Sequence, residues 1–233
     1  MTTRQAEVLK TIVEYYVQTA NPVGSKSLAQ QFSVSSATIR AEMAELERLD
    51  LITHPHTSAG RIPTDAGYRH YVESLARPSQ KLDSTSRLRR AIERRVKSAG
   101  SPQAAIKIAV DSLTQTTHNI AFATMGVAIY TKGFSQLFAR PEFDENAADI
   151  AGLLDNLELW LSETNIEEGI ATYIGEENAI GKSSGCSVIV ARYDSPFSEE
   201  SYIGVIGPTR QSYGQVMRVV EYTANTLQEV LSE

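Results

Sequence analysis

The chain has 233 residues, of which 42% are hydrophobic and 21% charged, so it can form one large or two modest domains with the balance of a globular protein. No run approaches the ~20 apolar residues of a membrane span, and the first seven residues lack the apolar segment of a secretion signal, which predicts a cytoplasmic location. The net charge of −6 divides into −1 over residues 1–75, +6 over 76–97 and −11 over 98–233.

Three helices are predicted at the start of the chain. Apolar residues at helical spacing indicate a first helix over residues 4–19, which the segment NPVG at 21–24 ends. Ser25 is expected to cap a second helix over residues 26–31. After a turn, Ser35 or Ser36 is expected to cap a third helix that runs to about residue 49. The apolar stripe of this helix consists of Ile39, Met43, Leu46 and Leu49.

A short β-ribbon and a fourth helix follow. Residues 51–54 and 61–63 are predicted strands on either side of a loop, and a helix is expected from residue 64 or 65 to about 75. Helices followed by a ribbon and a further helix are typical of a winged helix-turn-helix domain. The sequence therefore predicts such a domain over residues 1–75.

The rest of the chain is predicted to be a linker and an α+β domain. Leu88, Ile92 and Val96 recur at four-residue spacing among arginines, which indicates a basic helical linker over residues 76–100. A domain over residues 101–233 follows, in which strands alternate with helices. Its predicted helices are 102–117, 147–162 and 210–231, and its predicted strands are 118–125, 127–131, 169–174, 187–193 and 202–206.

The third helix has the features of a recognition helix. Small and hydroxyl-bearing residues at its start allow close approach to the major groove, and Arg40 can bond guanine through two hydrogen bonds. The start of the second helix, with Lys26, suits a phosphate, and Arg61 in the wing suits a phosphate or the minor groove. The candidate DNA-binding residues are Ser25, Lys26, Ser27, Ser35, Ser36, Thr38, Arg40, His56, Thr57, Ser58 and Arg61. The alternatives are an ordinary helix cap at 35–38 and a solvated charge at Arg61.

Other chemistry is weakly indicated. His54 and His56 could ligate a metal, but no cysteine, third histidine or carboxylate cluster lies near them in sequence. Cys186, the single cysteine, precedes an apolar strand and lacks a nearby histidine, so it is expected to be an ordinary buried thiol. No catalytic residue, cofactor or metal is therefore assigned, and the chain is predicted not to be an enzyme.

Several contiguous motifs resemble the heat-inducible transcription repressor HrcA family. They are NPVGSK at 21–26, VSSATIR at 34–40, PHTSAGRIPT at 55–64, GYR at 67–69, PEF at 141–143, YIGEE at 173–177 and IGPTR at 206–210. The resemblance implies a repressor of chaperone genes with a winged-helix domain and a GAF-like dimerisation or regulatory domain. It also implies a homodimer on an inverted-repeat operator in double-stranded DNA, and dependence on a GroEL-type chaperonin.

The sequence departs from this family in its length. Between the strand that ends near Met125 and the segment that begins near Val127, part of the GAF-like domain and a dimerisation segment are expected to be missing. Two other interpretations remain: a winged-helix protein-interaction module, which the near-neutral charge of residues 1–75 allows, and a regulator whose second domain senses a small molecule.

The basic segment 76–97 has three interpretations. Its arginines could form a solvated helix face, they could contact the DNA backbone and compensate for the near-neutral first domain, or they could dock against the acidic C-terminal domain.

Overall fold

A computed structural model describes residues 1–55, 60–75, 85–126, 128–139, 147–164, 166, 169–178 and 184–232. The chain divides into two compact units. The first unit is Met1–Ser79 with Arg210–Ser212, and the second is Gln80–Thr209 with Tyr213–Glu233.

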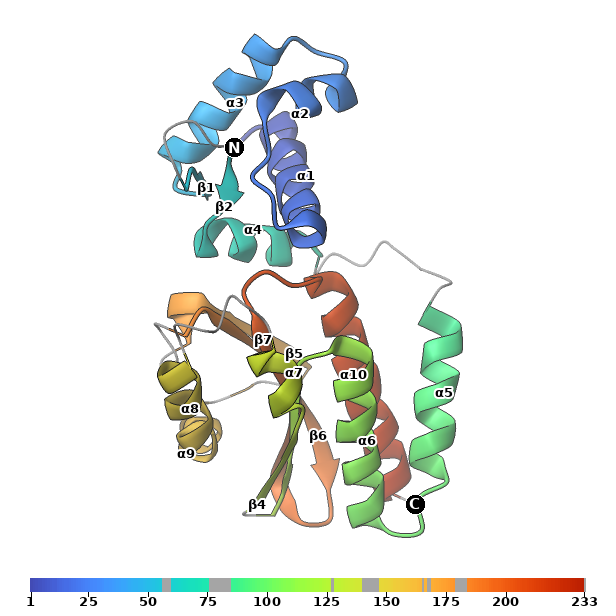
Figure 1. Cartoon of the computed structure of the whole chain (residues 1–233). Coiled ribbons are helices and arrows are strands. Elements are labelled where there is room, and N and C mark those ends of the chain that lie inside the picture. Colours follow the sequence, from blue (N-terminus) through green and yellow to red (C-terminus); the bar gives the residue numbers. More distant parts are fainter. Residues whose placement is uncertain are drawn as a thin grey trace. The chain divides into compact units, whose positions relative to one another are not determined.

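The first unit has the predicted winged helix-turn-helix order (Figure 1). Its elements are α1 (Thr3–Thr19), α2 (Ser25–Phe32), α3 (Ser36–Arg48), β1 (Ile52–Thr53), β2 (Ile62–Pro63) and α4 (Asp65–Leu75). The two strands pair antiparallel. Its core contains the predicted stripe residues Ile39, Met43 and Leu46, together with Val8, Leu9 and Ile12 of α1.

Local signals set the ends of these helices. Thr2 accepts a hydrogen bond from the Gln5 backbone while the Gln5 side chain accepts one from Thr2, a capping box that begins α1. Ala20 and Ser33 adopt the left-handed conformation that ends α1 and α2. Ser35 caps α3 by accepting a hydrogen bond from the Thr38 backbone at 3.0 Å, as expected.

The second unit is the predicted α+β domain. Its helices are α5 (Thr85–Lys97), α6 (Pro102–Thr117), α7 (Phe134–Phe138), α8 (Ala147–Asp155), α9 (Leu157–Glu163), the 3₁₀ turn η2 (Gly175–Glu177) and α10 (Tyr213–Ser232). Its strands are β3 (Ile120–Met125), β4 (Ala128–Lys132), β5 (Ile170–Ile174), β6 (Cys186–Ser195) and β7 (Ser198–Pro208).

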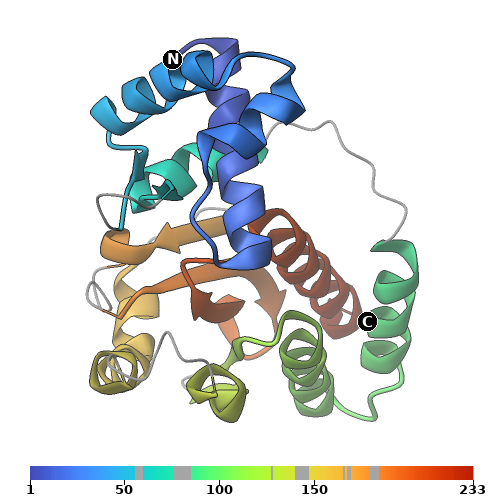
Figure 2. The ribbon, with the colours of Figure 1, turned by 45° about the horizontal axis from the view of Figure 1, so that its top comes forward.

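The five strands form one antiparallel sheet in the order β4-β3-β7-β6-β5. Helices α6 and α10 cover one face, and α8 and α9 cover the other (Figure 2). Because strand side chains alternate between faces, Val188 and Val190 pack towards the α8–α9 cluster, which includes Trp160. β6 is buried on both faces, and Cys186 at its start is a buried free thiol.

Four local expectations were wrong. Ser25 does not cap α2, because Gly24 occupies the cap position without a side-chain bond. Leu49 is the C-cap of α3, which ends at Arg48, and it is 38% exposed instead of belonging to the buried stripe. The predicted helix 147–162 is two helices separated at Asn156. His118 ends α6 in the left-handed conformation instead of starting a strand.

The basic helix α5 belongs to the second unit, where it packs on α6 and α10. Its apolar residues Ile92 and Val96 are buried there. In the described part of the chain, no helix is both long and apolar enough to cross a membrane.

Candidate nucleic-acid interface

The start of α3 is built from hydroxyl groups that bond one another. The Ser35 hydroxyl lies 2.9 Å from that of Thr38, and the Ser36 hydroxyl lies 2.9 Å from that of Ser25 at the start of α2. The Ser25–Ser36 contact ties the two helices together where both begin. A hydroxyl has one donor hydrogen and two acceptor lone pairs, so these residues can position the helix and still bond DNA.

Both helix starts favour an anion. Neither α2 nor α3 has an acidic residue in its first turn, and the backbone N–H groups at a helix start attract phosphate. Lys26 and Ser27 are exposed in the first turn of α2. Arg40 is exposed on α3, and no described residue is bonded to its guanidinium.

The wing begins against the turn between α1 and α2. Arg61 and Val23 exchange two backbone hydrogen bonds of 2.8 and 2.9 Å. A Cβ on Gly60 would lie 2.6 Å from the Val23 carbonyl carbon and oxygen, closer than atoms can approach. A glycine is therefore required at position 60 for the wing to meet this turn.

Glu47, near the end of α3, connects the recognition helix to both sides of the wing. Its carboxylate lies 2.5 Å from Nδ1 of His54 and accepts hydrogen bonds from Arg61, whose Nε and Nη2 lie 3.1 and 2.9 Å away. Arg61 is thus an intramolecular partner, with a side chain only 27% exposed. Sequence reasoning missed Glu47, because its partners lie 7 and 14 residues away and no spacing rule links them.

The charge on Glu47 is favoured by its partners. Burial by itself would raise the pKa of this carboxyl, but the hydrogen bonds from His54 and Arg61 outweigh burial and lower the pKa below its usual value of 4.5. Glu47 is therefore ionised at neutral pH, where it can hold the wing against α3.

We expect Glu47→Gln to lower the free energy of unfolding of the first unit by about 1–2 kcal/mol at pH 7, because hydrogen bonds to a charged group contribute about 1.5–3 kcal/mol. A carboxyl with a lowered pKa stabilises the fold above its unfolded pKa and loses that contribution as the pH falls through its folded value. The difference in unfolding free energy between the wild type and Glu47→Gln should therefore disappear as the pH falls below 4.5.

Chemical unfolding at pH 7 and pH 3 measures this difference. The control is Glu45→Gln on the same helix, since within the described residues Glu45 pairs with the exposed Arg48 alone and surface pairs contribute little. A difference at pH 3 equal to that at pH 7 would show that the Glu47 charge does not hold the wing.

Three predicted site residues, His56, Thr57 and Ser58, lie outside the described residues. Of the others, Ser25 is bonded to Ser36 and Ser35 to Thr38 through their hydroxyl groups, whereas Arg61 is bonded to Glu47. Within the described ranges, no three His, Cys, Asp or Glu side chains gather as metal ligands.

Two family models match the chain. The model described as "Winged helix-turn-helix transcription repressor, HrcA DNA-binding" matches residues 1–75, and the one described as "HrcA protein C terminal domain" matches residues 73–217. The chain belongs to the HrcA family. The resemblance seen in its sequence motifs is therefore confirmed, and HrcA proteins are transcription repressors with a winged-helix DNA-binding domain.

Relatives named "Heat-inducible transcription repressor HrcA" agree with this assignment. The protein of Desulfitobacterium hafniense is 27% identical, with 100% of this chain and 98% of the relative covered. That of Herpetosiphon aurantiacus is 58% identical over 72 residues, which are 31% of this chain and 20% of the relative. The first alignment runs over 341 positions, so this 233-residue chain is a shortened HrcA.

A solved structure shows the same fold. It is described as "Crystal structure of a hypothetical protein at 2.2 A resolution", with a TM-score of 0.82 and 21% identity, and the match covers 100% of this chain and 99% of that chain. Where the sequence predicts the missing segment, β3 and β4 pair directly, with Met125 opposite Ala128.

Proposed function

We propose that this HrcA protein represses chaperone genes by binding an inverted-repeat operator in double-stranded DNA, and that it acts by binding and not by catalysis. The observation that carries the proposal is the exposed Arg40 on α3, downstream of a helix start that has hydroxyl groups and no acid. Direct base contact by Arg40 would supply specificity, and Lys26 with the start of α2 would position the unit on a phosphate.

The active species in this proposal is a homodimer. One winged helix buries only ~600–1,000 Å² on DNA, which is too little for operator-level selectivity, and two copies on an inverted repeat double the contacts. Residues 1–75 would bind DNA, residues 76–100 would link the domains, and residues 101–233 would dimerise and regulate. Family membership supports a cytoplasmic setting and a GroEL-type chaperonin as a partner.

In vitro selection of duplex DNA with the full chain tests the proposal. We expect enrichment of a palindromic site, a sedimentation coefficient on that DNA consistent with two chains, and an affinity that falls linearly with salt on logarithmic axes. A monomer both free and on its selected site would contradict the dimer. Failure to enrich any sequence would favour a winged helix that binds proteins.

A further inference from the structure

The two sides of α5 carry arginines with different surroundings. At 100° per residue, the buried Ile92 and Val96 mark the side of α5 that faces α6 and α10. Arg89 and Arg95 flank that side. The guanidinium of Arg89 lies 5.0 Å from the centre of the Tyr222 ring, and Arg95 donates a hydrogen bond of 2.9 Å to Gln115.

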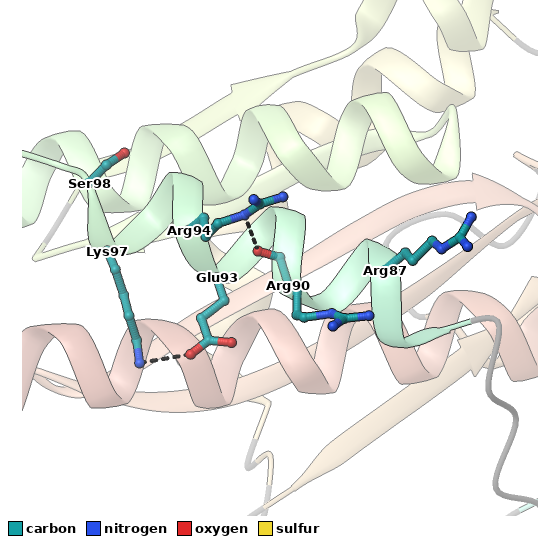
Figure 3. Close-up of a pocket in the computed structure, with 6 residues that line it drawn as sticks. All are labelled: Arg87, Arg90, Glu93, Arg94, Lys97 and Ser98. Carbon is teal, nitrogen blue, oxygen red and sulfur yellow. Dashed lines mark hydrogen bonds and ion pairs between the residues drawn. The ribbon is translucent and has the colours of Figure 1, made fainter.

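Arg87, Arg90 and Arg94 lie on the opposite side of α5. They fall within about 60° of one another around the helix axis, and all three are exposed. With Glu93, Lys97 and Ser98 they line an open groove of about 770 Å³ (Figure 3). The row spans about 10 Å along the helix, comparable to the advance of three phosphates at ~3.4 Å each on one DNA strand.

The charges in this groove do not cancel. Lys97 is paired with carboxylates, because its Nζ lies 2.8 Å from Glu93 and 3.6 Å from Glu229. The Glu93 hydrogen bond raises the pKa of Lys97. Among the described residues, no carboxylate is paired with Arg87 or Arg94. The groove therefore keeps a net positive charge.

This arrangement is unfavourable for the helix alone. Like charges three or four residues apart repel, and a cation near the start of α5, such as Arg87, opposes the helix dipole. A bound polyanion would relieve both effects.

We infer that Arg87, Arg90 and Arg94 contact the phosphate backbone of the DNA that residues 1–75 bind, an inference that rests on the proposed function. Charge supports DNA as the ligand of this groove. The first 75 residues have a net charge of −1, so binding a polyanion requires a cationic surface elsewhere in the chain. Chain connectivity also supports it. Nine residues separate Leu75 from Thr85, so the start of α5 stays within about 35 Å of the end of α4, roughly one turn of DNA.

The test compares two charge-matched double variants of the full chain on the selected operator and on a random duplex. We expect R87Q/R94Q to flatten the slope of log affinity against log salt by about two units. Between 50 and 200 mM salt, the wild type should then lose about 12-fold more affinity than this variant. Base preference should not change, because phosphate contacts carry no sequence information.

The control R89Q/R95Q removes the same charge from the other side of α5. It should keep the salt slope and lower the melting temperature of the second unit, whereas R87Q/R94Q should leave that temperature unchanged or raised. R87K/R94K should restore the slope, because lysine keeps the charge.

Equal slopes for wild type and R87Q/R94Q on a bound operator would overturn this inference alone. No salt-dependent binding by the wild type would overturn the proposed function as well.

Discussion

Replacing Gly67 by Ala should destabilise the DNA-binding unit by about 3 kcal/mol, the upper part of the range for forced overpacking. A Cβ at this position would lie 2.0 Å from the Leu51 carbonyl oxygen. Leu51 cannot shift freely, because its N–H bonds the Leu46 carbonyl and its carbonyl accepts a bond from Thr64. Within a helix, Gly→Ala ordinarily stabilises by up to ~1 kcal/mol, so the expected sign is reversed here.

Gly152→Ala in α8 is the matched control. Among the described residues, no atom outside its chain neighbours and the backbone of α8 lies within 4 Å of a Cβ built on Gly152, so this substitution should raise stability by up to ~1 kcal/mol through helix propensity. Chemical unfolding of the full chain, followed separately for each unit, measures both changes. A Gly67→Ala protein as stable as the wild type would mean that the wing and α4 can separate at Leu51 without cost.

Arg40→Ala should weaken binding to the selected operator by about 1–3 kcal/mol, the contribution of a good bidentate base contact. Binding to random duplex DNA should change much less, and the preference at one base position of the operator should relax. The reason is the exposure of Arg40 on α3, beside the buried stripe that contains Ile39 and Met43. Competition binding with operator variants measures the loss at each position.

Arg48→Ala is the control on the same helix. The guanidinium of Arg48 is held by Glu45 at 2.6 and 2.9 Å near the end of α3, away from the end expected to meet base edges. This variant should bind the operator as the wild type does. An equal loss of affinity for operator and random DNA in Arg40→Ala would instead assign Arg40 to a phosphate.

Periodic apolar patterns were sufficient to locate most helices and strands. The stripe Ile39, Met43 and Leu46 defined α3, and Ser101 with Pro102 marked the start of α6, where Ser101 accepts a hydrogen bond from Ala104. These features depend on residues within a few positions of one another. The cap at Ser35 and the exposed position of Arg40 were predictable for the same reason, because both are local properties of one helix.

Contacts between distant residues decided the rest. Glu47 meets His54 and Arg61, and Ser25 bonds Ser36, only because folding brings α2, α3 and the wing together. The sequence by itself determined that α5 is helical and basic. Only the packing of Ile92 and Val96 on α6 and α10 decided which arginines contact these two helices and which lie on the opposite side of α5. A helix pattern specifies one buried side, but the element that covers that side is supplied by tertiary structure.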